Sequence, residues 1–405
     1  MSILYLTQNG IADHIGQSQV APYLLGLARK GHAIELLSAE KPGQDETIER
    51  YQRLFDEAGV TWTRVPYRRA PKVLGPLWTQ WHLEQAAKAI ISAKEIDAIH
   101  CRSYPAALIG HRLKRRFGIK YLYDFRDFYA DGGLAKGSRL LRPLYRRMKQ
   151  HEGPMIREAD RIVCLTDKAR DLLIEWYLAN DPMAASRFAV IPCCADFAHF
   201  DPASVSPAAQ DAARMQLGLK PGQTVLLYLG SLGPDYLLPQ MMELFAELIH
   251  LRPDAVFLFV ANNGSDLVEA RCRAMGIDPD RVVFTSVDRA KVPTLISLAT
   301  LSVVFIRADL SKAGCSPTKL AELFAMNVPI IANSGVGDLD MIIEPQRNGS
   351  VLVADFSRNT LRQALSKVIE LQAMGGIAIR SNSTEFDVRA GVEGYSRVYR
   401  QLESN

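Results

Sequence analysis

The segment Ala313–Ile331 contains residue types that suit the binding of a phosphorylated ligand. Ser316 is a typical N-cap residue and Pro317 a typical first helical residue, so a helix is predicted to begin here. Its free backbone N–H groups and the positive end of its dipole would face the preceding loop and attract an anion. Lys319 adds a full positive charge at the same end. We therefore expect a diphosphate to bind at Ser316, Pro317, Thr318 and Lys319.

A carboxylate follows on the same predicted helix. Glu322 is six residues beyond Ser316, about 9 Å along the axis, and its side chain leans back toward the N-terminus. It is placed to accept hydrogen bonds from ribose hydroxyls. The alternative is an ordinary capped helix in which Lys319 and Glu322 form a surface pair. The predicted buried strand after the helix, followed by Gly335 and Gly337, favours the binding site.

Other local patterns argue against competing chemistries. The loop after the first predicted strand, residues 7–18, lacks the glycine spacing of a dinucleotide-binding turn. Gly314-Cys-Ser-Pro-Thr lacks the second glycine of a nucleophile elbow. The pair Asp338 and Asp340 has metal-binding spacing, but helix capping is the better interpretation. Six scattered cysteines without a C-x-x-C pair indicate reduced thiols, and no metal-binding cluster is evident.

Short apolar runs alternate with segments of helical period, which is typical of βαβ units and parallel sheets. We predict strands at 3–6, 33–37, 98–100, 120–123, 161–165, 188–191, 224–229, 255–261, 281–284, 301–305, 329–332 and 350–353. The Pro- and Ser-containing stretch 201–209 separates two halves, each resembling a doubly wound sheet. The predicted fold class is α/β, with two Rossmann-like domains.

Composition limits the classes of function. The chain has 405 residues, 48% of them hydrophobic and 23% charged, which suits two globular domains. A net charge of +4 is too balanced for a protein devoted to nucleic-acid binding. No apolar run reaches the ~18 residues needed to span a bilayer, and no basic leader precedes an apolar stretch. We expect a cytoplasmic protein.

The helix segment and several other motifs together resemble a known family. The motifs are Gly16-Gln-Ser-Gln-Val-Ala-Pro-Tyr-Leu, Arg29-Lys-Gly-His, Glu158-Ala-Asp-Arg-Ile-Val-Cys-Leu-Thr, Val190-Ile-Pro-Cys-Cys-Ala-Asp with Phe200, Tyr228-Leu-Gly-Ser-Leu, and Ser316-Pro-Thr-Lys-Leu-Ala-Glu before Val328-Pro-Ile-Ile. Their joint order and spacing, over nearly the whole chain, are similar to those of retaining GT-B-fold glycosyltransferases of the family-4 type (glycosyl transferases group 1).

The resemblance implies two facing domains. Residues 1–203 would bind the acceptor and residues 204–385 a UDP-, GDP- or other nucleotide-diphosphate sugar. The helix within 386–405 would cross back to complete the first domain. Catalysis would need no metal and no cofactor besides the donor substrate. The implied donor-binding residues, beyond those of the helix segment, are Gly16, Gly230, Ser231 and Arg307.

The chain also departs from the family pattern. Gly314 stands where the first of two glutamates is expected, so a contact to the transferred sugar is missing or supplied otherwise. Ser231 and Tyr236 replace the usual Arg and Lys after the strand that ends at Gly230. Lys319, together with Arg307, is expected to compensate for these two charges.

Two arginines replace family histidines in the first domain. Arg102 and Arg126 suit an acidic acceptor or the leaving phosphate, because guanidinium binds both bidentately. Alternatively they form a structural network with the nearby aspartates. Asp124, Asp127 and Asp131 are the preferred candidates for orienting an acceptor hydroxyl, ahead of the histidines.

The stretch Lys136–Lys149 has six basic and no acidic residues, interleaved with apolar ones. Such a helix can rest on an anionic membrane, or it can be a solvated face whose leucines pack on their own domain. We expect a glycosyltransferase, peripheral on the inner membrane face, acting on a glycan or polyprenyl-linked glycan in surface polysaccharide synthesis. The alternatives are a nucleotide-sugar epimerase of the same fold and a non-catalytic sugar-nucleotide-binding protein.

Overall fold

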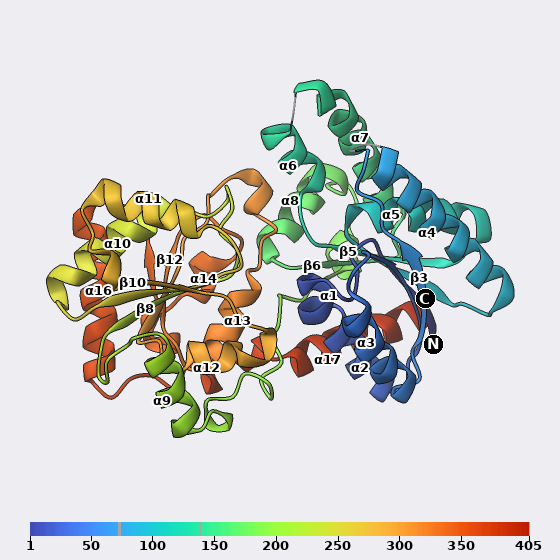
Figure 1. The fold of residues 1–405 in the computed structure, drawn as a ribbon. Coiled ribbons are helices and arrows are strands. Elements are labelled where there is room, and N and C mark those ends of the chain that lie inside the picture. Colours follow the sequence, from blue (N-terminus) through green and yellow to red (C-terminus); the bar gives the residue numbers. More distant parts are fainter. Residues whose placement is uncertain (72–73, 138, 405) are drawn as a thin grey trace. The chain divides into compact units, whose positions relative to one another are not determined.

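The computed structural model describes residues 1–71, 74–137 and 139–404, apart from the side chain of Lys136. The chain divides into two compact units (Figure 1). Unit 1 comprises Met1–Cys193, Ala313–Cys315 and Val388–Asn405, and unit 2 comprises Cys194–Lys312 and Ser316–Asp387. Each unit has its own parallel sheet.

Unit 1 contains a seven-stranded sheet in the order β3-β2-β1-β4-β5-β6-β7. Its strands are β1 (Ser2–Thr7), β2 (Ala33–Glu40), β3 (Thr61–Pro66), β4 (Ala98–Arg102), β5 (Lys120–Phe125), β6 (Arg161–Cys164) and β7 (Phe188–Val190). Its α-helices are α1 (His14–Gln19), α2 (Ala21–Arg29), α3 (Asp45–Glu57), α4 (Leu74–Ala93), α5 (Ser103–Phe117), α6 (Tyr129–Lys136), α7 (Arg142–Glu158), α8 (Asp167–Tyr177) and α17 (Val388–Glu403). The strand order reverses between β1 and β4, which is the usual ligand-binding position of such sheets.

Unit 2 contains a six-stranded sheet in the order β10-β9-β8-β11-β12-β13. Its strands are β8 (Val225–Leu229), β9 (Val256–Val260), β10 (Val282–Thr285), β11 (Leu301–Val304), β12 (Ile330–Asn333) and β13 (Val351–Val353). Its α-helices are α9 (Pro207–Gln216), α10 (Leu238–Leu251), α11 (Ser265–Met275), α12 (Val292–Ile296), α13 (Thr318–Ala325), α14 (Leu339–Ile342), α15 (Pro345–Asn348) and α16 (Arg358–Ala373).

Short 3-10 helices join several of these elements. They are η1 (Arg139–Leu141), η2 (Ala184–Arg187), η3 (Pro202–Ser204), η4 (Pro279–Arg281), η5 (Arg289–Lys291), η6 (Leu310–Lys312) and η7 (Ser381–Phe386).

The central strands consist of continuous apolar runs because helices cover both faces of a parallel sheet. All five residues of β8 and all five of β9 are buried. They pair in parallel from Val225 opposite Val256 to Leu229 opposite Val260. This register aligns the carboxyl ends of β8 and β9 at one edge of the sheet, where the loops that bear polar residues begin.

The C-terminal helix α17 belongs to unit 1, which confirms the predicted returning helix. It packs on α2 so closely that a Cβ added at Gly26 would lie 2.5 Å from Cγ2 of Val392. Tyr395, Tyr399 and Leu402 bury its apolar face in the unit. Residue 405, at the end of the predicted segment 386–405, lies outside the described residues.

Within the described part of the chain, no helix combines the length and apolar character needed to cross a bilayer.

Candidate functional site

The predicted anion-binding segment lies at the start of α13, with one correction. Helix α13 begins at Thr318, and its N-cap is Pro317, whose backbone is extended (φ −70°, ψ 119°). The prediction that Ser316 caps the helix and Pro317 opens it is therefore wrong. The extended ψ of Pro317 delays the helix by one residue, and Ser316 lies in the preceding loop. The first turn of α13 still presents its N–H groups toward that loop.

Lys319 is held by two aromatic rings in unit 2. Its side chain is buried (8% exposed), and Nζ lies 4.4 Å from the ring centroid of Tyr228 and 4.2 Å from that of Tyr236. Such cation–π contacts favour the charged ammonium and fix its position. Gly230 makes room for it, since a Cβ there would lie 3.2 Å from Nζ. The Lys319 charge is thus fixed beside the carboxyl end of β8.

Hydrogen bonds to the backbone hold the loop after β8, which contains Tyr236. The hydroxyl of Tyr228 donates a hydrogen bond to the carbonyl of Ser231 (2.9 Å). Tyr236 forms an isolated antiparallel bridge with Ile306, next to Arg307. Arg307 is exposed, and its Nη2 donates to the carbonyl of Pro234 (2.9 Å). Arg307 therefore braces the loop, and its predicted role as a diphosphate charge stays a prediction.

Glu322 lies one turn further along α13 and is also buried (7% exposed). Nη1 of Arg289, in η5, donates to Oε1 of Glu322 at 3.0 Å. Burial raises the pKa of Glu322, while the positive charges of Arg289 and Lys319 oppose the rise. The alternative of an exposed Lys319–Glu322 pair is wrong, because both side chains are buried and Lys319 points at the tyrosines.

Sequence reasoning missed the partners of Glu322. His199 Nε2 lies 3.2 Å from the carbonyl oxygen of Arg289, and the guanidinium of Arg289 lies 5.2 Å above the ring of Phe200. These residues are far from Glu322 in the chain, and although Phe200 belongs to a motif noted in the sequence, nothing in that motif indicates a contact with Arg289. Only the tertiary structure brings them together.

In unit 1, three predicted residues gather at the carboxyl ends of β4 and β5. Nη1 of Arg126 lies 3.3 Å from Oδ1 of Asp124 and 3.2 Å from the hydroxyl of Tyr395. Oδ2 of Asp124 lies 3.5 Å from Nε2 of His100. Arg102 is buried beside them, and its Nη1 donates to Oδ1 of Asn9 (3.3 Å).

The electrostatics of this cluster favour the structural alternative for Asp124 and Arg126. Asp124 is 1% exposed, and burial by itself raises its pKa. The charge of Arg126 and the neighbouring ring of His100 outweigh burial and hold the pKa of Asp124 well below its usual range. Burial lowers the pKa of His100, whose Nδ1 lies 2.7 Å from the hydroxyl of Tyr399. An ionised Asp124–Arg126 pair and a neutral imidazole therefore connect the sheet to α17.

The other two aspartates lie elsewhere in unit 1. Asp127 is exposed in the loop between β5 and α6. Asp131, on α6, binds Nζ of Lys149 at 2.7 Å. The same ammonium binds Glu152 (2.8 Å) and lies 4.3 Å from the ring centroid of Trp176. Lys149 therefore points into a partly buried network with Asp131 and Glu152, and Asp131 is separated from the Asp124 cluster.

Comparison with known proteins identifies the family. Residues 17–194 match the model of the glycosyl transferase 4-like domain, and residues 223–371 match that of the glycosyl transferases group 1. The chain belongs to the GT4-like glycosyltransferases. A curated relative, the D-inositol 3-phosphate glycosyltransferase of Segniliparus rotundus, is 26% identical over 322 residues. The match covers 75% of this chain and 65% of that relative.

Solved structures show the GT-B fold of this glycosyltransferase. Sucrose-phosphate synthase from Thermosynechococcus elongatus has a TM-score of 0.73 and 16% identity, covering 100% of this chain and 99% of its own. HepE of Anabaena in complex with UDP-glucose has a TM-score of 0.70 and 15% identity, with both chains covered completely.

Gly16, the donor-binding glycine predicted in the first domain, lies in α1 of this glycosyltransferase. A Cβ at Gly16 would come within 2.1 Å of the carbonyl oxygen of Gly10, so α1 packs directly on the loop after β1. The carboxylate of Glu40 holds that loop by accepting hydrogen bonds from the N–H groups of Ile11 (2.7 Å) and Ala12 (3.2 Å). Glu40 is a buried positioning residue that the sequence analysis did not single out.

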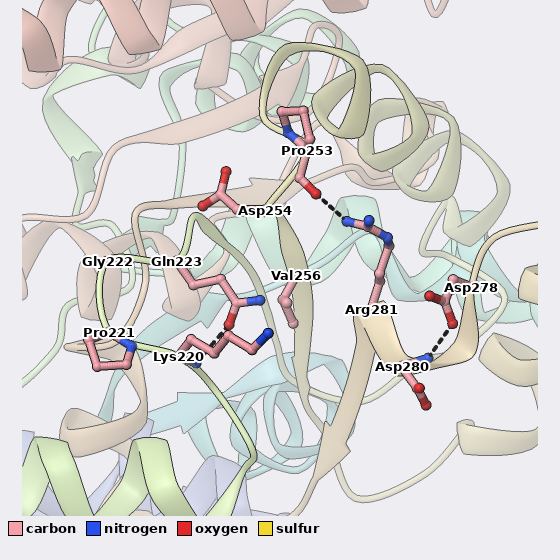
Figure 2. Close-up of a pocket in the computed structure, with 10 residues that line it drawn as sticks. All are labelled: Lys220, Pro221, Gly222, Gln223, Pro253, Asp254, Val256, Asp278, Asp280 and Arg281. Carbon is pink, nitrogen blue, oxygen red and sulfur yellow. Dashed lines mark hydrogen bonds between the residues drawn. The ribbon is translucent and has the colours of Figure 1, made fainter.

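A depression of about 430 Å³ in unit 2 is separate from this site (Figure 2). Lys220 and Gln223 line it before β8, Asp254 before β9 and Arg281 before β10. Ligands of parallel α/β sheets bind at the carboxyl ends of the strands. The depression lies at the amino ends, opposite the edge that bears Gly230 and Lys319.

Among residues 1–71, 74–137 and 139–404, no group of three or more His, Cys, Asp or Glu side chains is placed to hold a metal ion.

Proposed function

We propose that this glycosyltransferase transfers a sugar from a nucleotide-diphosphate sugar to an acceptor hydroxyl, with retention at the anomeric carbon. The observation that carries the proposal is the pairing on α13 of a tyrosine-held Lys319 with an Arg289-bound Glu322. The fixed cation of Lys319 suits the diphosphate of the donor, and the buried carboxylate of Glu322, further along the same helix, suits the ribose hydroxyls. The likeness to HepE, solved with UDP-glucose, supports a UDP-sugar as the first donor to test.

The proposed donor site binds the diphosphate through backbone N–H groups and through the charge of Lys319. The N–H groups at Ser316, Thr318 and Lys319 and the Lys319 ammonium stabilise the leaving diphosphate as its charge develops. Pro317 sets the direction in which the chain enters α13. The small residues Gly230 and Ser231 leave backbone groups accessible to the phosphates. Arg307 and Gly16 complete the proposed donor set. Glu322 accepts the ribose hydroxyls in its ionised form, which Arg289 favours.

Residues 1–203 bind the acceptor in this proposal, and residues 204–385 bind the donor. Asp127 is the exposed carboxylate that orients the acceptor hydroxyl. Arg102 and Arg126 supply positive charge for an acidic acceptor, and Asp124 and Asp131 hold the basic side chains of Arg126 and Lys149 in position. The bond from the sugar to the phosphate oxygen breaks, the acceptor oxygen bonds to the same face, and its proton passes to the departing phosphate.

The positive charge on the surface of unit 1 indicates the class of acceptor. We propose a glycan, free or polyprenyl-linked, in surface polysaccharide synthesis at the inner face of a membrane. The exposed arginines of η1 and α7 support an anionic, membrane-borne acceptor.

A panel of nucleotide sugars in a thermal-shift assay, followed by turnover, tests the proposal. A ligand at 100 times its dissociation constant stabilises a protein by about 2.7 kcal/mol. Nucleotide diphosphate released only with acceptor indicates transfer. Isomerised sugar would indicate an epimerase, and binding without chemistry a non-catalytic binding protein. Glu322→Gln should abolish turnover, whereas Glu243→Gln, on an exposed position of α10, is the matched control.

A further inference from the structure

Helix α4 displays apolar side chains to solvent. Leu74, Leu77 and Trp81 are exposed, Trp81 by 58%. Their spacing of three and four residues places them on one face of the helix. Scattered exposed leucines are ordinary, but a tryptophan and two leucines in line on one helix form a patch that indicates a partner.

A second exposed element lies in η1 and α7. Leu140 is 89% exposed, and Leu144 is exposed as well. Two other apolar residues of the predicted basic segment are partly buried: Met148 packs on the core of unit 1, and Tyr145 packs on Gly133, where a Cβ would lie 2.2 Å from the ring. The carbonyl of Met148 accepts a hydrogen bond from the hydroxyl of Tyr104 (2.8 Å). Ser138 and the Lys136 side chain lie outside the described residues.

The two elements flank the same turn of unit 1. Nε2 of Gln80, on α4, donates to the carbonyl of Pro105 (2.8 Å). Tyr104, the preceding residue, donates to Met148 on α7. Both helices therefore contact the first turn of α5, and Figure 1 shows α7 and the beginning of α4 at one end of the unit.

Arginines surround these apolar side chains. Six exposed arginines lie before α4 and along η1 and α7: Arg68, Arg69, Arg139, Arg142, Arg146 and Arg147. Guanidinium groups bind phosphate bidentately. Separate apolar side chains interleaved with arginine match the interface of an anionic bilayer, where tryptophan lies at headgroup depth.

We propose that this docking face, formed by Leu74, Leu77, Trp81, Leu140, Leu144 and the six arginines, inserts its apolar side chains into an anionic bilayer. The arginines bind lipid phosphates, and α4 and α7 enter the interface together. Binding of this kind needs neither donor nor acceptor. The proposal rests on the membrane location given in the proposed function, but vesicle binding and sugar transfer can be measured separately.

Flotation of the full chain with vesicles tests the docking face. Vesicles of phosphatidylglycerol and phosphatidylcholine in equal parts should bind the protein at low salt, and phosphatidylcholine alone should bind it weakly. Arg142→Glu with Arg146→Glu should weaken binding at least about thirtyfold, the equivalent of ~1 kcal/mol for each of the two basic side chains. Leu77→Ser with Trp81→Ser should weaken it to a similar degree and abolish a vesicle-induced blue shift of tryptophan fluorescence.

Matched controls come from unit 2. Arg273→Glu and Met215→Ser change exposed side chains far along the chain and should leave binding unchanged. Donor affinity should be equal in all variants, which separates docking from the sugar-transfer site. Absence of binding to anionic vesicles, or binding that both pairs of substitutions leave intact, overturns the proposal. If only the arginine double variant loses vesicle binding, insertion of α4 into the bilayer is refuted, and the protein adsorbs to the surface through its arginines alone.

Discussion

The ammonium of Lys319 lies 4.2 Å from the ring centroid of Tyr236, at the position where the family resemblance led us to expect a lysine. The positive charge near β8 is thus supplied by α13 instead of by the loop after the strand. The aromatic ring at position 236 holds that charge in place. A fixed cation therefore lies beside Gly230 although Ser231 and Tyr236 follow this glycine in place of the expected Arg and Lys.

Removing and then returning this charge tests its role. Lys319→Met should weaken donor binding about tenfold to a hundredfold, since hydrogen bonds to charged groups contribute about 1.5–3 kcal/mol. Tyr236→Lys in the Lys319→Met background should restore part of the affinity, because it places an ammonium beside the same glycine. Calorimetric titration with a nucleotide sugar measures both effects. Lys220→Met is the exposed control, and unchanged affinity in Lys319→Met would refute the assignment.

Arg289→Met should make donor binding sensitive to acid. Burial raises the pKa of Glu322 and Arg289 opposes the rise, so loss of Arg289 raises the pKa further. The carboxylate then becomes protonated at a higher pH than in the native protein, and affinity falls earlier as the pH decreases. Titrations across the acidic range measure the shift. Glu322→Gln should bind weakly at every pH, and coinciding profiles for the native protein and Arg289→Met would contradict the pairing.

A single methyl group at Gly230 should impair donor binding. Gly230 has a positive φ of 108°, and an added Cβ would lie 3.2 Å from Nζ of Lys319. Gly222→Ala is a matched control, with a φ of 75° and open space around the new Cβ. Both substitutions should lower the free energy of unfolding by about 1 kcal/mol or more. Only Gly230→Ala should also reduce donor affinity. Equal affinity in the two variants would show that the Lys319 position is unimportant.

Acid should destabilise unit 1 through His100. Burial lowers the pKa of His100 from its ordinary value of 6.5, so the unfolded chain takes up this proton at a higher pH than the folded one. The stabilisation is complete above the ordinary pKa and is lost as the pH falls through the lowered value. The thermal midpoint of the native protein should fall more steeply between about pH 7.5 and 5.5 than that of His100→Gln. His14→Gln, at an exposed position, should keep the native slope.

Strands that are buried on both faces, such as β8 and β9, follow the predicted pattern of continuous apolar runs. Every predicted run, from residues 3–6 to 350–353, overlaps a strand of the structure. The missed strand, β3, forms the edge of its sheet. Its residues alternate between buried Trp62 and Val65 and exposed Arg64, and it ends at Pro66. Polar and exposed residues interrupt β3, so it lacks the continuous apolar run by which the other strands were predicted.

Residues within one helix were easier to predict than partners from distant loops. Lys319 and Glu322 were predicted from helix geometry together with the family resemblance of their segment, and the structure places both on α13. The tyrosines around Lys319 and the arginine beside Glu322 depend on how β8, β11 and η5 meet. Neither the spacing nor the type of these residues predicts that the tyrosines contact Lys319 or that the arginine contacts Glu322. In the same way, Asp131 lies near Asp124 in sequence, but helix α6 turns it toward Lys149.

The position of α17 affects the order in which the polypeptide matures. Tyr395 and Tyr399 supply hydroxyl partners for Arg126 and His100, two residues encoded in the first third of the chain. A ribosome must therefore synthesise all of unit 2 before these buried polar groups acquire their partners. During translation, Arg126 and His100 therefore lack these hydrogen-bond partners until the last helix, α17, leaves the ribosome and packs on the first sheet. Nascent chains halted before residue 388 should accordingly be more sensitive to proteases and should bind chaperones more than the full chain does.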